Sequence, residues 1–207
     1  MLIPILIQAK WRNVALWKCF PLAVLLTISG TLGTYLWFFI ENHWIGGTSF
    51  FGAVFVVPVL FLAVSKLLRI PYGQIMDLCA PAECAMLAIM KIQCLLSGCC
   101  EGRVLGILEN GTSIVFPSQI AELINALVIL VALLIMSRKK RFGRVLYPWY
   151  MIIYGCSRFV LNIFREEWVT TKMIMPFGNI WSLVAIGVGV AWLFFQNKRK
   201  VSSDEST

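Results

Sequence analysis

The sequence predicts an all-α polytopic membrane protein with about six transmembrane helices. First, 59% of its 207 residues are apolar, well above the roughly 45–50% of ordinary soluble domains. Second, several stretches are long and apolar enough for a helix of about 20 residues to cross the hydrocarbon of a bilayer. Third, the positive charges gather in alternate connections between these stretches, as loops on the cytoplasmic side do.

The expected spans follow one another with short connections. They cover residues 15–40, 48–68, 76–97, 118–137, 145–164 and 178–196. After the last span the sequence leaves a polar tail over residues 197–207, and no stretch is typical of a soluble domain. We therefore expect residues 1–207 to form a single transmembrane domain.

The basic loops predict the orientation of these spans. If six helices alternate, four basic groups fall on one side: Lys10, Arg12 and Lys18; Lys66 and Arg69; residues 138–144; and residues 198–200. That side is expected to be cytoplasmic and to hold both termini. The formal charge of +8 is thus a sign of orientation, and no nucleic-acid partner is expected. The opposite loops hold the only histidine, His43, so any chemistry is expected to open outward.

The connection between the first two spans is rich in glycine. The sequence GGTSFFGA (46–53) leads into the second span, and glycine allows tight turns or close backbone approach at helix ends. The third span ends in a similar way, at SGCCEG (97–102). Because glycine is also common in membrane helices, helix packing explains these positions as well as ligand binding does.

Charged residues within the third, fourth and fifth spans need a reason, because a charge at membrane depth costs about 2.5–3.5 kcal/mol on insertion scales. Glu83 and Lys91 lie in the third span, and Glu122 lies two turns into the fourth, near Gln119. In the fifth, Arg158, Asn162 and Arg165 are spaced i, i+4, i+7 and so share one helical face. Because successive spans run in opposite directions, Lys91, Gln119, Glu122 and Arg158 are expected at similar depths near the outer surface.

This polar group has two interpretations. The cations could pair with Glu122 and Glu83 as structural links, or extend to the interface. Alternatively, they form a site for an anionic lipid headgroup, in which Arg158 binds phosphate through its fork and Lys91 adds a point charge. The convergence of three spans at one depth favours the lipid site.

The seven cysteines offer a third possibility, a redox or metal site. Most lie in apolar runs and are expected to act as small apolar residues. Cys94, Cys99 and Cys100 are close in sequence, but they lack the C-x-x-C spacing of redox helices and the four-ligand pattern of zinc sites. We expect no metal and no cofactor.

Several stretches, read in order, resemble the prolipoprotein diacylglyceryl transferase family. They are GGTSFFGA, DLCAPAECAMLAIMKIQCLLSGCCEGR, PSQIAE, YGCSRFVLNIFRE and GNIWSL, and they cover about residues 30–185. The resemblance implies a bacterial inner-membrane, multi-pass enzyme that moves the diacylglyceryl group of phosphatidylglycerol to the thiol of a lipobox cysteine in a preprolipoprotein. Family members usually have seven spans, so the chain resembles this fold without its first span.

The resemblance also implies site residues. The implied catalytic residues are Arg158, Lys91 and Glu122, and the implied substrate-binding residues are Gly46, Gly47, Ser49, Phe51, Gly52, Gly98, Cys99, Gln119, Asn162 and Arg165. Departures from the family pattern bear on activity. Phe51 and Phe116 stand where the family has histidines, Lys91 replaces an arginine, and Cys99 and Asn162 replace acids.

Two functions follow from this resemblance. The first is the transferase itself, with His43, Glu101 or Glu122 as the base, or with a thiol acidified by nearby cations and no strong base. The alternative is a catalytically inactive relative that binds lipid or lipoprotein, since Phe51 replaces the family histidine.

Overall fold

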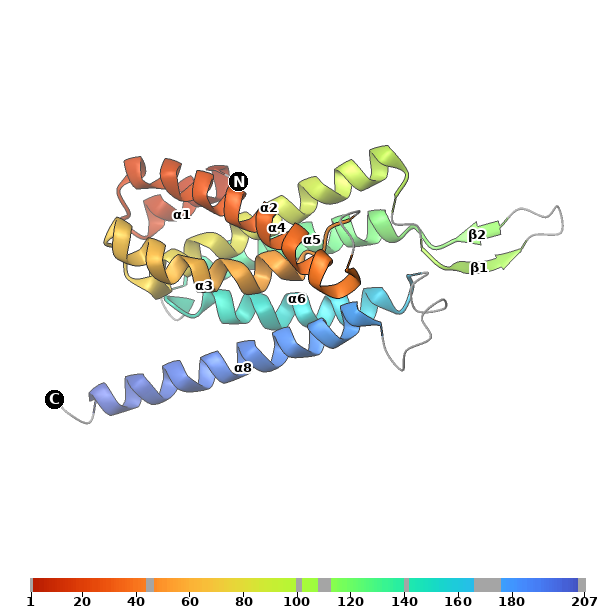
Figure 1. Ribbon diagram of the computed structural model, residues 1–207. Coiled ribbons are helices and arrows are strands. Elements are labelled where there is room, and N and C mark those ends of the chain that lie inside the picture. Colours follow the sequence, from red (N-terminus) through yellow and green to blue (C-terminus); the bar gives the residue numbers. More distant parts are fainter. Residues whose placement is uncertain are drawn as a thin grey trace.

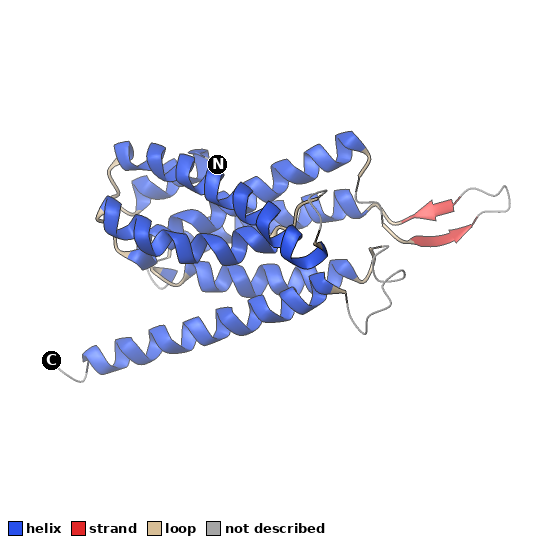
Figure 2. Ribbon diagram, in the orientation of Figure 1, coloured by secondary structure: helices blue, strands red, loops and turns tan. Residues whose placement is uncertain are grey.

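The computed structural model of this chain describes residues 2–43, 47–99, 102–107, 113–139, 142–165 and 176–204. Within them it is a bundle of α-helices with a two-stranded hairpin extending from one end (Figures 1 and 2). The elements are α1 (Leu2–Trp11), the 3₁₀ helix η1 (Leu16–Lys18), α2 (Cys19–Asn42), α3 (Phe51–Leu68), α4 (Tyr72–Ser97), β1 (Val104–Ile107), β2 (Ser113–Val115), α5 (Ser118–Ser137), α6 (Leu146–Asn162) and α8 (Phe177–Asp204).

A helix lies over each of the six expected spans. Four helical stretches are long and apolar enough to cross a membrane: Leu16–Asn42, Phe51–Leu68, Ser118–Arg138 and Phe177–Lys198. Helix α4 is long enough but carries Asp77, Glu83 and Lys91, and α6 has 17 residues, the short end of the usual range of about 17–25. The prediction of a mostly helical membrane protein is thus supported. That six helices cross the membrane and that both termini are cytoplasmic stay predictions.

Three features differ from the expected all-α chain. Helix α1 precedes the first expected span; its 10 residues are too few to cross a bilayer. The connection between α4 and α5 contains an antiparallel hairpin in which Val104 pairs with Val115 and Ile107 with Ser113. Helix α8 continues to Asp204, through most of the expected polar tail, whose lysines and arginine are good helix formers.

The helices pack in pairs that are neighbours along the chain. The most extensive contacts join α2 to α3, α4 to α5, and α6 to α8. Gly33 and Gly52 bring α2 and α3 together: a Cβ on Gly52 would lie 1.9 Å from the Gly33 carbonyl oxygen. Only glycine fits at such a close crossing of two helix backbones.

The outer surface of the bundle is apolar, as a lipid-facing surface must be. Large apolar side chains such as Phe20 on α2, Val131 on α5 and Phe194 on α8 are 67%, 55% and 67% exposed. In a soluble protein, apolar exposure on this scale would mark an interaction surface. Here it is consistent with helices that contact acyl chains. In Figure 1 the hairpin and the C-terminus lie at opposite ends of the bundle.

Candidate functional site

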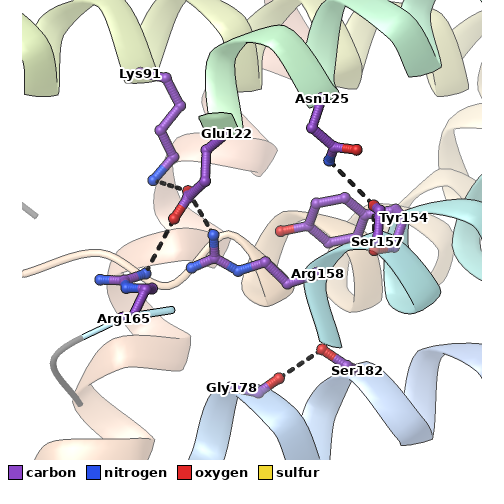
Figure 3. A network of polar contacts seen from close by, with 9 residues as sticks. All are labelled: Lys91, Glu122, Asn125, Tyr154, Ser157, Arg158, Arg165, Gly178 and Ser182. Carbon is purple, nitrogen blue, oxygen red and sulfur yellow. Dashed lines mark hydrogen bonds and ion pairs between the residues drawn. The ribbon is translucent and has the colours of Figure 1, made fainter. Parts of the chain in front are cut away.

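The carboxylate of Glu122 lies at the centre of a group of three cations near the hairpin end of the bundle (Figure 3). Lys91 Nζ lies 2.5 Å from Glu122 Oε2, and Arg158 Nη1 pairs with the same oxygen. Arg165 Nη1 is 3.7 Å from the other oxygen, Oε1. We call these four residues the Glu122 cluster. They come from α4, α5, α6 and the turn after α6.

The Glu122 cluster is largely shut off from solvent. The Glu122 side chain is 4% exposed, and those of Lys91, Arg158 and Arg165 are 10%, 13% and 13% exposed. Among these four residues, three cations gather around one carboxylate. Cations held close together in a site of low dielectric attract an anion strongly. The two guanidinium groups add planar forks that match phosphate oxygens.

Each member of the cluster has a clear structural reason for its position. Lys91 and Glu122 meet because α4 and α5 pack along one another. Arg158 lies in the last turns of α6, but the helix ends at Asn162, before Arg165. The hairpin base holds Arg165 instead: Gly102 forms an antiparallel bridge with it, and the Arg103 N–H donates to the Phe164 carbonyl at 3.0 Å.

Aromatic rings lie on two sides of the cluster. Phe51, which is 3% exposed, packs on Tyr154 with ring centroids 5.6 Å apart, and Tyr154 lies one turn before Arg158 on α6. Phe116 stacks on Phe164 at 4.9 Å, next to Arg165. The two phenylalanines thus contact the immediate neighbours of different cluster arginines. Apolar rings beside the cations exclude water and strengthen their pull on an anion.

The sequence model of the prolipoprotein diacylglyceryl transferase family matches residues 3–195 of this chain. The chain belongs to this family. It is 27% identical over 202 residues to the phosphatidylglycerol–prolipoprotein diacylglyceryl transferase of Geobacter sulfurreducens, covering 88% of this chain and 78% of that protein. Proteins of the same name give 22% identity in Dehalococcoides mccartyi (78% and 66% covered) and 25% in Acinetobacter baumannii (84% and 74% covered). The family is one of transferases.

The structure brings together the three catalytic residues that the family resemblance implies. Lys91, Glu122 and Arg158 are in direct contact, as their common depth led us to expect. Glu83 does not join them. It is fully buried on α4 and accepts a hydrogen bond from the Tyr147 hydroxyl at 3.1 Å. Pairing of Lys91 with Glu83, one of the structural alternatives, is therefore not what the fold forms.

Other implied residues lie at the ends of α4, α5 and α6, outside the four residues of the Glu122 cluster. Gln119 donates to the Cys99 carbonyl at 2.7 Å and so fastens the end of α4 to the start of α5. Asn162 is buried, and its Nδ2 lies against Gly178 at the start of α8. Gly98 caps α4 in the left-handed conformation, with φ of 65°. These residues shape the loops from which Arg165 is held.

The glycine-rich stretch that leads into α3 has a mainly structural role. Ser49 donates to Glu41 at 3.1 Å, and its N–H donates to the Thr34 carbonyl. Gly47 lies against the Phe38 ring, and Gly52 makes the helix crossing described above. Gly46 lies outside the described residues, as do Cys100 and Glu101. The implied role of this stretch in binding substrate stays a prediction.

Sequence reasoning missed part of the site. It expected Arg165 on one helical face with Arg158 and Asn162, but α6 ends at Asn162 and the hairpin base holds Arg165. It therefore missed the ion pair of Arg165 with Glu122. It also missed the hydrogen bond from Asn125 Nδ2 to Ser157 Oγ, at 3.1 Å, which joins α5 to α6 beside the cluster (Figure 3). Asn125 follows Glu122 by three residues, so helical spacing could have indicated it.

The described cysteines and His43 form no ion pair or hydrogen bond with Glu122 that the structure shows. Within the described residues, Cys19, Cys79 and Cys84 are buried thiols, and no group of three histidine, cysteine or acidic side chains is arranged to hold a metal. Cys99 is exposed. His43 is exposed at the C-terminal cap of α2, with φ of 52°. Neither residue is part of the Glu122 cluster.

Proposed function

We propose that this protein is a phosphatidylglycerol–prolipoprotein diacylglyceryl transferase of the bacterial inner membrane, with its site on the outer side. The observation that carries the proposal is the buried Glu122 cluster, in which two arginines and a lysine gather at one point, as binding of a lipid phosphate requires. Membership of the family supplies the reaction type. The basic loops at the other end of the bundle support the outward orientation.

In this proposal the cluster binds the phosphodiester of phosphatidylglycerol. Arg158 and Arg165 contact its oxygens through their forks, and Lys91 adds a third positive charge. The sulfur of the acceptor cysteine then forms a bond to the glyceryl carbon. The bond from that carbon to the phosphate oxygen breaks, and glycerol phosphate leaves with the electron pair. The cations stabilise the negative charge that develops on the leaving phosphate.

The acceptor thiol must lose its proton to attack, and in this scheme the proton passes to water. We propose that the positive field of the cluster makes this possible by lowering the pKa of a thiol that docks nearby, as cationic neighbours do for other cysteines. Glu122 is already engaged by three cations, so its proposed role is to hold them in place. His43 is exposed at the end of α2 and is not needed in this scheme.

A second function has one observation in its favour. Phe51 and Phe116 stand at positions where the family resemblance implies histidines, and both pack on rings beside the cluster. A site with cations and apolar rings could hold phosphatidylglycerol, or a lipoprotein that already carries lipid, without turnover. The lipid-binding relative therefore remains the alternative to the transferase.

The two functions are separated by one reconstitution experiment. Purified protein in phosphatidylglycerol vesicles is mixed with a lipobox peptide, and the peptide mass is measured. We expect a gain of one diacylglyceryl group, no gain in phosphatidylcholine vesicles, and a loss of roughly a hundredfold in rate for Arg158→Ala. The matched control is Arg69→Ala, which removes an exposed cation from the other end of the bundle.

The outcomes are distinct. A normal rate in Arg158→Ala would contradict the proposed site. No modified peptide, together with phosphatidylglycerol binding that Arg158→Ala abolishes, would support the alternative. No modification and no lipid binding would overturn both functions.

A further inference from the structure

A cavity lined by cations lies at the end of the bundle opposite the hairpin. Its volume is about 670 Å³, within the range of about 300–1,000 Å³ typical of small-ligand pockets. It is lined by Trp11, Arg12, Ser137, Arg138, Lys139 and Gly143. These residues come from the end of α1, the end of α5 and the connection to α6. Three of them are cations and none is an acid.

The acid nearest this cavity is already committed to other groups. Asp77 is fully buried near the start of α4 and pairs with Arg12 Nη1 at 2.6 Å. It also accepts hydrogen bonds from the backbone N–H groups of Arg144 and Leu146. Asp77 thus fixes the Arg12 guanidinium at the cavity wall while its own oxygens are saturated.

Arg12 keeps donors that the described residues do not use. Its Nε and Nη2 atoms are buried and have no hydrogen-bond acceptor among them. A buried donor without a partner carries a desolvation cost. An anion in the adjoining cavity would balance the charge of the cations that line it.

The second arginine of the cavity, Arg138, stacks on the Trp11 ring. The Arg138 guanidinium lies 4.8 Å from the centroid of Trp11, a cation–π contact that fixes its position. Lys139 follows it and is exposed. The cavity therefore combines two positioned guanidinium groups, one flexible ammonium and an aromatic wall. This combination is suited to a phosphate group attached to a larger organic body.

Orientation alone does not explain this arrangement. The charge rule for membrane loops requires only that lysine and arginine be present on the cytoplasmic side. Lys66 and Arg69 at the same end meet that requirement as exposed side chains outside the cavity. Arg12 and Arg138 are instead fixed around a cavity by an ion pair and a ring.

We propose that this cavity binds the phosphate of an anionic ligand, as a site separate from the Glu122 cluster. Two sources share this chemistry: an anionic phospholipid headgroup in the leaflet at this end, and free inorganic phosphate. Basic pockets between membrane helices on the cytoplasmic side bind lipid headgroups in this way. The bound phosphate joins the ends of α1 and α5, and the inference does not depend on the proposed transferase activity.

The test compares two double variants that each remove two positive charges from the same end of the bundle. Arg138→Gln with Lys139→Gln alters the cavity, and Lys66→Gln with Arg69→Gln is the matched control. Detergent-solubilised protein is titrated with phosphatidylglycerol or phosphatidylcholine, and bound lipid is counted by native mass spectrometry. A parallel arm adds inorganic phosphate as a competitor. Thermal melting checks that all variants are folded.

We expect the cavity variant to hold one phosphatidylglycerol fewer than the wild type, or to bind it roughly tenfold more weakly, while the control variant behaves as wild type. Phosphatidylcholine should bind all three proteins equally. Displacement by inorganic phosphate would assign the cavity to the free anion, and its failure to compete would assign it to the lipid headgroup. Equal binding of both lipid and phosphate by the two double variants would overturn the proposal.

Discussion

Arg158 of α6 and Glu122 of α5 form an ion pair that is almost closed to solvent, with side chains 13% and 4% exposed. The same Glu122 oxygen is 2.5 Å from Lys91 Nζ. A single carboxylate thus holds two cations from two other helices. Removing Glu122 takes away the carboxylate that these cations share, whereas removing one cation leaves that carboxylate paired with the others.

The first prediction concerns Glu122→Gln. The change keeps the size of the side chain but leaves three cations without their anion. We expect a loss of about 3 kcal/mol in stability, measured as a lower melting temperature in detergent. Phosphatidylglycerol should restore more of the lost stability in this variant than it adds to the wild type, because a phosphate replaces the carboxylate. Glu41→Gln, at the end of α2, is the control; equal responses to lipid would contradict the prediction.

The second prediction separates charge from geometry at Arg158. Arg158→Lys keeps the positive charge but loses the planar fork. We expect the lysine variant to bind phosphatidylglycerol with little change in KM and to transfer lipid about tenfold more slowly, against roughly a hundredfold for Arg158→Ala. Steady-state kinetics with a lipobox peptide measure both constants. If the lysine and alanine variants are equally slow, charge at this position is not what the reaction uses.

The third prediction concerns Lys91, which stands where the family resemblance implies an arginine. Lys91→Arg adds a fork beside Glu122, so we expect a lower KM for phosphatidylglycerol and a rate at least equal to that of the wild type. Lys91→Gln should lose activity, since it removes a charge from the cluster. The same transfer assay compares the two variants. An arginine variant as inactive as the glutamine variant would show that the site has no room for the fork.

The fourth prediction tests the crossing of α2 and α3. Gly52→Ala places a Cβ 1.9 Å from the Gly33 carbonyl oxygen, so the two helices must separate. We expect a loss of several kcal/mol in stability and low yield of folded protein. Gly187→Ala is the control, because nothing lies within 4 Å of its Cβ position on α8. The Gly187→Ala variant should gain about 0.5–1 kcal/mol in stability. Similar melting temperatures for the two variants would contradict the close approach of α2 and α3 at Gly52.

Local signals in the sequence were enough to place most helices. The ranges 118–137 and 145–164 lie within two residues of α5 and α6, because apolar runs bounded by proline, glycine or charge fix where a membrane helix can begin and end. Helix α1 and the hairpin were missed. Neither has the length of a span, and β1 and β2 depend on pairing with each other rather than on their own sequence.

The sequence by itself determined the apolar helices, the sides on which the basic loops gather, and the common depth of Lys91, Glu122 and Arg158. Helical spacing and the cost of charge in a membrane are local rules, so they can be read along one chain. Only the tertiary structure decided that the Glu122 carboxylate pairs with Lys91, Arg158 and Arg165, the last of which the hairpin base holds. It also decided that Arg12 and Arg138 line one cavity at the opposite end of the bundle. Those contacts join residues far apart in the sequence, and their geometry depends on how the helices pack.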